Sequence, residues 1–129
     1  MAQFCGVDII EVNRVKEAIL NTQGFKERVF TKKEIEVGDN KSDAVKYQYY
    51  AGRFAAKEAV YKALSSKFGD KLWLGDIEIL NDSKLLNRPY VVFKNTDLEL
   101  MQKQGTLEID VSVSHIEALA IASSTVSIH

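Results

Sequence analysis

The stretch LEIDVSVSHIEALAIASSTV, residues 107–126, gives the clearest indication of the fold. In residues 107–114 apolar and polar side chains alternate, which is typical of a strand with one buried face. Residues 118–126 are apolar enough for the centre of a sheet. Because only residues 115–117 separate the two segments, we predict an antiparallel hairpin.

Residues 47–66 form the second decisive segment, a long helix rich in Ala, Lys and Glu. Small side chains recur along one stripe, which allows the helix to sit close against a neighbour. We therefore expect the α+β class, a single domain over residues 1–129 in which helices pack on a mostly antiparallel sheet. The stripe consists of Ala51, Ala55, Ala59 and Ala63.

Shorter segments complete the predicted order of elements. A strand is expected at residues 4–10, followed by a helix that ends before Gly24. Thr31-Lys-Lys-Glu34 fits a capping box, so a short helix begins there. The polar residues 38–46 are expected to form a loop. Farther along we expect a strand at 73–80, a turn at 81–83, a strand at 90–93 and a helix at 97–104.

Composition limits the classes of function. A formal net charge of -1 provides no overall basic field for nucleic acid or a membrane, so a charged partner needs a local patch. Cys5 is the only cysteine, which excludes an intramolecular disulfide. The first ten residues lack the pattern of a signal peptide, and no apolar stretch approaches the ~20 residues that span a bilayer. We expect a cytoplasmic protein.

Asp8, within the apolar run GVDIIEV of residues 6–12, is the first candidate functional residue. A carboxylate in a packed strand has to be paired, metal-bound or solvated, because burying it alone is costly. Strand parity places Asp8 on one face with Gly6 and Ile10. Asp8 to Glu11 also matches a capping box for the next helix. A capping role and a ligand role both remain open.

Glu58 and Lys62, in RFAAKEAVYKAL (residues 53–64), are four residues apart and share a helix face, beside a row formed by Arg53, Lys57 and Tyr61. One interpretation is a solvated surface pair worth roughly 0.2–0.5 kcal/mol. The other is an acid beside a cation that together hold a metal and a phosphate oxygen.

His115 lies at the end of its predicted strand, on the apolar face. It is either a structural residue or a ligand-binding one. Ser112 and Ser114 point the other way, which argues against a Ser-His nucleophile pair. The sequence contains no CxxC, HExxH, Walker or GxGxxG motif, so a zinc site and a mononucleotide P-loop are not expected.

Taken together, GVDIIEVNRV, RFAAKEAVYKAL, WLGDIEILND with RPY after it, and VSVSHIEALAIA resemble the holo-acyl-carrier-protein synthases over nearly the whole chain. These small bacterial 4′-phosphopantetheinyl transferases move phosphopantetheine from coenzyme A to a serine of acyl carrier protein. They release adenosine 3′,5′-bisphosphate, use Mg²⁺ and serve fatty acid biosynthesis.

The resemblance implies roles for individual residues. Asp8 and Glu58 correspond to the metal ligands, and with Lys62 they would form the catalytic group. Lys62 and His115 correspond to positions that contact coenzyme A, and we assign Arg53 and Ser66 to the same site. The proton acceptor for the carrier serine would be Glu58, or a water held by Glu58 or Asp8.

The resemblance also implies partners. Arg14 corresponds to an arginine that contacts the acidic carrier protein, and Lys16, Lys26 and Arg28 could extend a basic patch. Members of the family are typically homotrimers with active sites between subunits. The sequence does not decide which subunit supplies which residue.

Two loops depart from the family pattern. A glycine-containing turn is replaced by Ser65 to Gly69, where serine hydroxyls and Lys67 could compensate. A glycine before Pro89 is absent, and Asn87 could adopt the left-handed conformation instead. These changes keep two alternatives open: a non-catalytic coenzyme A or nucleotide-binding module, and an unrelated α+β interaction domain.

Overall fold

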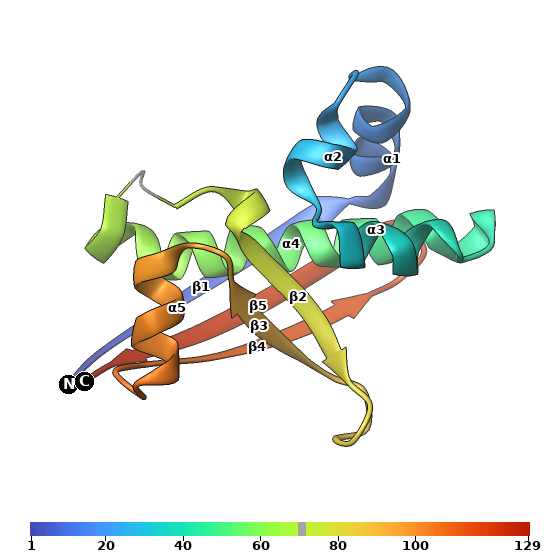
Figure 1. The fold of residues 1–129 in the computed structure, drawn as a ribbon. Coiled ribbons are helices and arrows are strands. Elements are labelled where there is room, and N and C mark those ends of the chain that lie inside the picture. The colour runs from blue at the N-terminus through green and yellow to red at the C-terminus, as the bar shows by residue number, and fades with distance from the viewer. Residues whose placement is uncertain (70–71) are drawn as a thin grey trace.

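The computed structural model describes residues 1–69 and 72–129. Figure 1 shows a long helix lying across a curved sheet, with the two chain ends side by side. The elements are β1 (Ala2–Glu11), α1 (Val12–Asn21), α2 (Phe25–Val29), α3 (Lys32–Asp39), α4 (Asp43–Phe68), β2 (Ile77–Asp82), β3 (Arg88–Phe93), α5 (Thr96–Lys103), β4 (Leu107–His115) and β5 (Leu119–Ile128).

The predicted C-terminal hairpin is confirmed: β4 ends at His115, and β5 begins at Leu119. β5 is the middle strand of a three-stranded sheet with the order β1-β5-β4, and both of its pairings are antiparallel. The register places Asp8 of β1 opposite Ala122 of β5. The strongly apolar strand therefore lies at the sheet centre, as its composition predicted.

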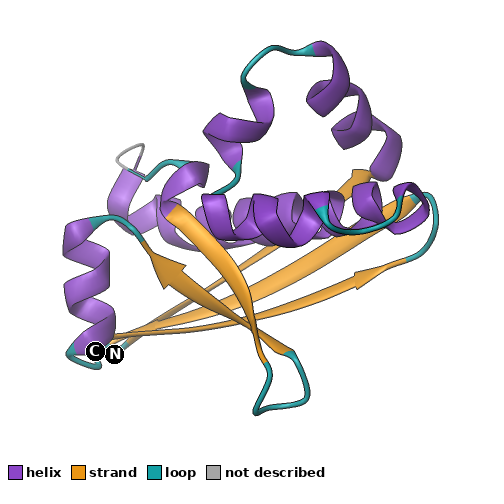
Figure 2. Ribbon diagram, turned by 45° about the vertical axis from the view of Figure 1, so that its right-hand side comes forward, coloured by secondary structure: helices purple, strands orange, loops and turns teal. Residues whose placement is uncertain are grey.

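The small-residue stripe of α4 is buried against this sheet. A Cβ atom on Gly6 of β1 would lie 2.0 Å from the carbonyl oxygen of Ala59, so only glycine allows this approach. Ser124 of β5, which is 2% exposed, donates its hydroxyl to the same carbonyl at 2.8 Å. These contacts fix α4 across β1 and β5 (Figure 2).

A second, separate antiparallel sheet consists of β2 and β3. Its apolar residues Ile77, Ile79, Val91 and Phe93 are buried in the common core. The expected strand at 73–80 begins too early, because Leu74–Asp76 form a turn of 3-10 helix before β2. The helices and both antiparallel sheets confirm the expected α+β class.

The prediction of a loop at residues 38–46 is wrong. Helix α3 continues to Asp39 and α4 already begins at Asp43, so only a short connection is left. Most of residues 38–46 are polar because they are exposed to solvent, and the ends of helices are exposed as well as loops. The capping box is confirmed: Thr31 accepts from the Glu34 amide, and the Glu34 side chain accepts from the Thr31 amide. The short helix α2 was not expected from the sequence.

One face of the three-stranded sheet packs on α4, and the other carries exposed apolar side chains. Val7, Ile9 and Ile121 are 57%, 61% and 42% exposed, and Ile9 lies opposite Ile121 in the register. None of the helices in residues 1–69 and 72–129 is long and apolar enough to cross a membrane.

Candidate active site

Asp8 and Lys62 meet where α4 crosses β1. The Lys62 Nζ atom donates to the Asp8 Oδ1 atom at 3.0 Å and to the Val7 carbonyl oxygen at 3.1 Å. The Asp8 side chain is 14% exposed and that of Lys62 52%. Strand parity placed Asp8 on the face of Gly6, which faces α4, and the structure confirms that placement.

The capping role considered for Asp8 is wrong. Among the described residues, the N-cap of α1 is Glu11, and its side chain makes no capping hydrogen bond. Asp8 lies within β1, three residues before that cap, and directs its carboxylate to Lys62 instead.

Glu58 lies one helical turn before Lys62 on α4 and is half-buried. Burial raises the pKa of Glu58 above its ordinary value, the charge of Asp8 raises it further, and Lys62 opposes both effects. The two carboxylates and the ammonium group therefore interact within one chain. A divalent cation would relieve the repulsion between the carboxylates.

Arg53 and His115 line a different site, a cavity of about 440 Å³. Arg53 is 8% exposed, and its Nη2 atom donates to the Asn81 Oδ1 atom at 2.9 Å. Its guanidinium lies 4.7 Å from the centre of the Tyr49 ring, and its buried Nε atom has no hydrogen-bond partner among the described residues. His115 is exposed at the end of β4. The cavity is also lined by Lys41, Gly52, Asn87, Pro89 and Val113.

The cavity and the Asp8 cluster lie on different sides of α4. Arg53 and Glu58 are five residues apart, and at about 100° per residue their side chains point roughly 140° apart around the helix. The structure thus brings Asp8, Glu58 and Lys62 together, and separately Arg53 and His115. The Asp8 cluster comes from a single chain, which the sequence left undecided.

The remaining predicted site residues lie on the surface. Ser66 is exposed on α4, one turn beyond Lys62, and Arg14 is exposed on α1. Of the residues that could extend a basic patch, Lys26 is paired with Asp39 at 3.0 Å. Its charge is therefore partly neutralised.

Asn81 and Lys41 line the cavity and were not identified from the sequence. The left-handed conformation suggested for Asn87 is confirmed, with a φ angle of 58°. Leu86 shares this conformation with a φ angle of 55°, which is unusual for a leucine. No local pattern in the sequence indicates that these residues meet, because the cavity joins α4 to the β2–β3 turn and the end of β4.

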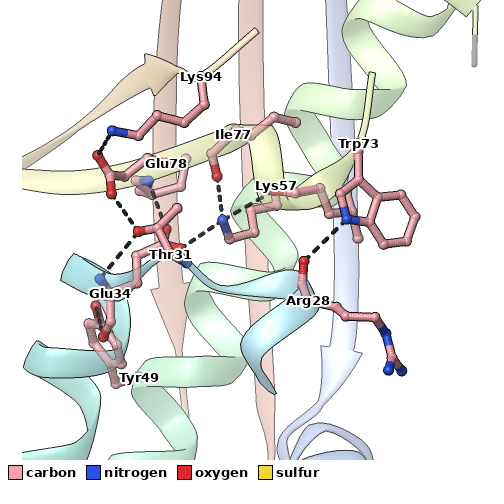
Figure 3. A network of polar contacts seen from close by, with 11 residues as sticks. Arg28, Thr31, Glu34, Tyr49, Lys57, Trp73, Ile77, Glu78 and Lys94 are labelled. Carbon is pink, nitrogen blue, oxygen red and sulfur yellow. Dashed lines mark hydrogen bonds and ion pairs between the residues drawn. The ribbon is translucent and has the colours of Figure 1, made fainter. Parts of the chain in front are cut away.

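Lys57 belongs to a buried polar network, shown in Figure 3. Its Nζ atom lies 2.7 Å from the Glu34 Oε1 atom, and both side chains are fully buried. The Glu34 Oε2 atom accepts from the Ile79 amide at 2.8 Å, and Thr31 donates its hydroxyl to Glu78. The sequence placed Lys57 in a row beside the Glu58 face and gave no sign of this network.

Two carboxylates are available at the Asp8 cluster for a metal. Within the described ranges, no group of three or more His, Cys, Asp or Glu side chains is arranged to hold an ion. Mg²⁺ commonly keeps several waters and takes one or two carboxylates together with substrate phosphates. Asp8 and Glu58 provide the two carboxylates of such a donor set.

Comparisons with known proteins identify the family of the chain. The family model of the 4′-phosphopantetheinyl transferase superfamily matches residues 4–121. A holo-[acyl-carrier-protein] synthase of Ruminiclostridium cellulolyticum is 46% identical over 129 residues, covering 99% of this chain and 94% of the relative.

Two solved structures are also similar. The holo-(acyl-carrier-protein) synthase from Bacillus anthracis, in complex with CoA (3′,5′-ADP), is 28% identical with a TM-score of 0.79, covering 99% of this chain and 100% of that one. The Chronobacterium ammoniagenes ACPS-CoA complex is 25% identical with a TM-score of 0.82, covering 100% and 99%. The chain belongs to the holo-[acyl-carrier-protein] synthase family of 4′-phosphopantetheinyl transferases.

Proposed function

We propose that this protein transfers 4′-phosphopantetheine from coenzyme A to a serine of acyl carrier protein. The observation that carries the proposal is the contact of Lys62 with Asp8, together with the electrostatic interaction of Glu58 with both, within one chain of this family. The serine oxygen attacks the phosphorus that bears the pantetheine, and the bond to the other phosphate breaks. Adenosine 3′,5′-bisphosphate leaves. The reaction would serve fatty acid biosynthesis in the cytoplasm.

Asp8 and Glu58 would hold Mg²⁺ together with the coenzyme A diphosphate. Bound there, the ion would supply neutralisation of the charge that develops on the leaving phosphate. Lys62 adds a second positive charge beside the same phosphates. Glu58, or a water held by Glu58 or Asp8, accepts the serine proton. A carboxylate whose pKa is raised is a stronger base, and burial has this effect on Glu58.

We infer that Arg53 and His115 bind coenzyme A in the site of a neighbouring subunit, with Ser66 nearer the catalytic cluster. Two observations support a homotrimer with shared sites. The cavity of Arg53 and His115 lies on another side of α4 from Glu58. The three-stranded sheet leaves Val7 and Ile9 exposed on its free face, where another subunit could bury them.

Subunit mixing tests this arrangement. Glu58→Gln and His115→Ala proteins are each expected to be nearly inactive. Co-expressed, they would form mixed trimers in which some sites combine an intact Glu58 with an intact His115 from the neighbour, so activity returns. If activity stays at the level of the separate variants while mass photometry confirms mixed trimers, the shared site is wrong.

The reaction itself is tested by mixing the protein with apo acyl carrier protein, coenzyme A and Mg²⁺, followed by mass spectrometry of the carrier. We expect a phosphopantetheine adduct on the carrier, and a greatly reduced yield with Glu58→Gln. Coenzyme A binding without an adduct on a competent carrier would favour the non-catalytic binding module. Neither binding nor adduct would favour an unrelated interaction domain.

A further inference from the structure

Lys62 contacts the carboxylate of Asp8, which would also be a ligand of the proposed metal. Its Nζ atom contacts the Asp8 Oδ1 atom at 3.0 Å and the Val7 carbonyl oxygen at 3.1 Å. In the part of the chain that the structure describes, Lys62 is the one ion-pair partner of Asp8. The carboxylate is 14% exposed and has little access to water. The lysine therefore satisfies a carboxylate that would otherwise be poorly solvated.

The Lys62 side chain can move away from Asp8. Its side chain is 52% exposed and has a flexible four-carbon stem. Val7 belongs to β1, an edge strand of its sheet, so its carbonyl oxygen is contacted by Lys62 from outside the sheet. A partly exposed ion pair of this kind is weak. Glu58, one turn earlier on α4, offers a divalent cation a second carboxylate that Lys62 does not bond in this arrangement.

We propose that Lys62 is the counter-ion of Asp8 in the metal-free protein, and that the divalent cation displaces it toward the coenzyme A diphosphate. This inference rests on the proposed function. The lysine neutralises Asp8 first, the metal then neutralises both carboxylates, and the released lysine meets the phosphates. The exchange neither forms nor breaks a covalent bond.

Two consequences follow from this exchange. The metal has to compete with Lys62 for Asp8, so the free protein binds metal more weakly than the carboxylates alone would. Once metal is bound, Lys62 is available to the phosphates, so metal and coenzyme A strengthen each other's binding by equal factors. A lysine held in one place would repel the metal and attract coenzyme A independently, and would add nothing to that mutual strengthening.

Metal binding to the full-length protein separates the two models. Mn²⁺, which takes the same oxygen ligands as Mg²⁺, is titrated into the wild-type protein and into Lys62→Met, and free Mn²⁺ is followed by its EPR signal. The titrations are repeated with saturating coenzyme A. Lys103→Met is the matched control, because it removes an exposed lysine paired with Glu99 at 2.8 Å on α5.

We expect Lys62→Met to bind Mn²⁺ about two- to five-fold more tightly than the wild type, the range set by a partly exposed ion pair. The factor by which coenzyme A tightens Mn²⁺ binding should fall by a similar amount. Lys103→Met should change neither quantity. Lys62→Gln should repeat the result with a polar side chain.

Unchanged or weaker Mn²⁺ binding by Lys62→Met would overturn the exchange. Tighter binding with an unchanged coenzyme A factor would also overturn it, in favour of a fixed repelling charge. The proposed function fails separately, when wild-type protein that binds coenzyme A and Mn²⁺ leaves a competent carrier protein unmodified.

Discussion

Breaking the buried ion pair between Lys57 and Glu34 is expected to destabilise the protein more than removal of any surface pair. Both side chains are fully buried, and the Nζ and Oε1 atoms lie 2.7 Å apart. Lys57 also donates to the carbonyl oxygens of Leu74, at 3.2 Å, and Ile77. Burial nevertheless lowers the pKa of Lys57, because the loss of hydration outweighs the attraction of Glu34. The pair is therefore satisfied but does not stabilise strongly relative to two solvated charges.

The substitution Lys57→Met leaves the Glu34 carboxylate buried without its cation. Removing one partner of a buried pair costs about 3–5 kcal/mol. With a urea m-value of about 1.5 kcal/mol/M, the unfolding midpoint should fall by roughly 2–3 M. The double substitution Glu34→Gln with Lys57→Met removes both charges. We therefore expect its loss of unfolding free energy to be smaller than the sum of the two single losses, by about 1–3 kcal/mol.

Urea unfolding followed by circular dichroism measures these values, with Lys103→Met as the control. That exposed pair on α5 should contribute only about 0.2–0.5 kcal/mol. A Lys57→Met midpoint within the range of the control would refute the buried-pair reasoning, and so would strictly additive single effects. If Lys57→Met alone does not fold, the double variant is still expected to fold, and its failure would count equally against the reasoning.

Three further predictions concern the strand contact, the catalytic carboxylate and the carrier surface. Gly6→Ala should destabilise by at least about 1–3 kcal/mol in the same urea assay, because its Cβ would meet the Ala59 carbonyl oxygen at 2.0 Å; wild-type stability would contradict that contact. Burial and Asp8 raise the pKa of Glu58, so its ionisation costs stability as pH rises above the ordinary glutamate value, about 4.3. Glu58→Gln should therefore melt higher than the wild type near neutral pH and lose that advantage below this value; a constant difference would argue against it. Arg14→Glu should slow association with acyl carrier protein and reduce its dependence on salt in stopped-flow measurements, whereas an unchanged salt dependence would place the carrier elsewhere.

The sequence predicted the elements whose side-chain periodicity is strong. Alternation in residues 107–114 and the alanine stripe of α4 correspond to a real strand and a real buried face. The resemblance placed Asp8 and Lys62 in one site but did not predict the ion pair between them, and residues that far apart have no spacing rule to join them. The polar segment 38–46 was misjudged, since polarity reports exposure and helix ends are exposed as well.

Lys57 illustrates what local pattern cannot supply. Helical spacing placed it correctly in a row with Arg53 on α4, but its burial depends on Glu34 from α3 and on carbonyl groups around β2. Those partners are distant in sequence, and each of them is an ordinary residue of its own segment. A lysine in a helix is normally expected to be exposed to solvent. The burial of Lys57 becomes evident only when the segments are assembled into the core.

The position of Lys57 on α4 also connects stability to the site. A helix turns by about 100° per residue, so a side chain anchored at one position fixes the directions of its neighbours. With Lys57 held by Glu34, the next residue, Glu58, faces Asp8 on β1, and Arg53 faces the cavity that His115 lines. Rotating the helix to bring Arg53 toward Asp8 would pull Lys57 out of its buried contacts. For this reason we expect the two groups of residues to be combined by a neighbouring subunit rather than by a rearrangement within one chain.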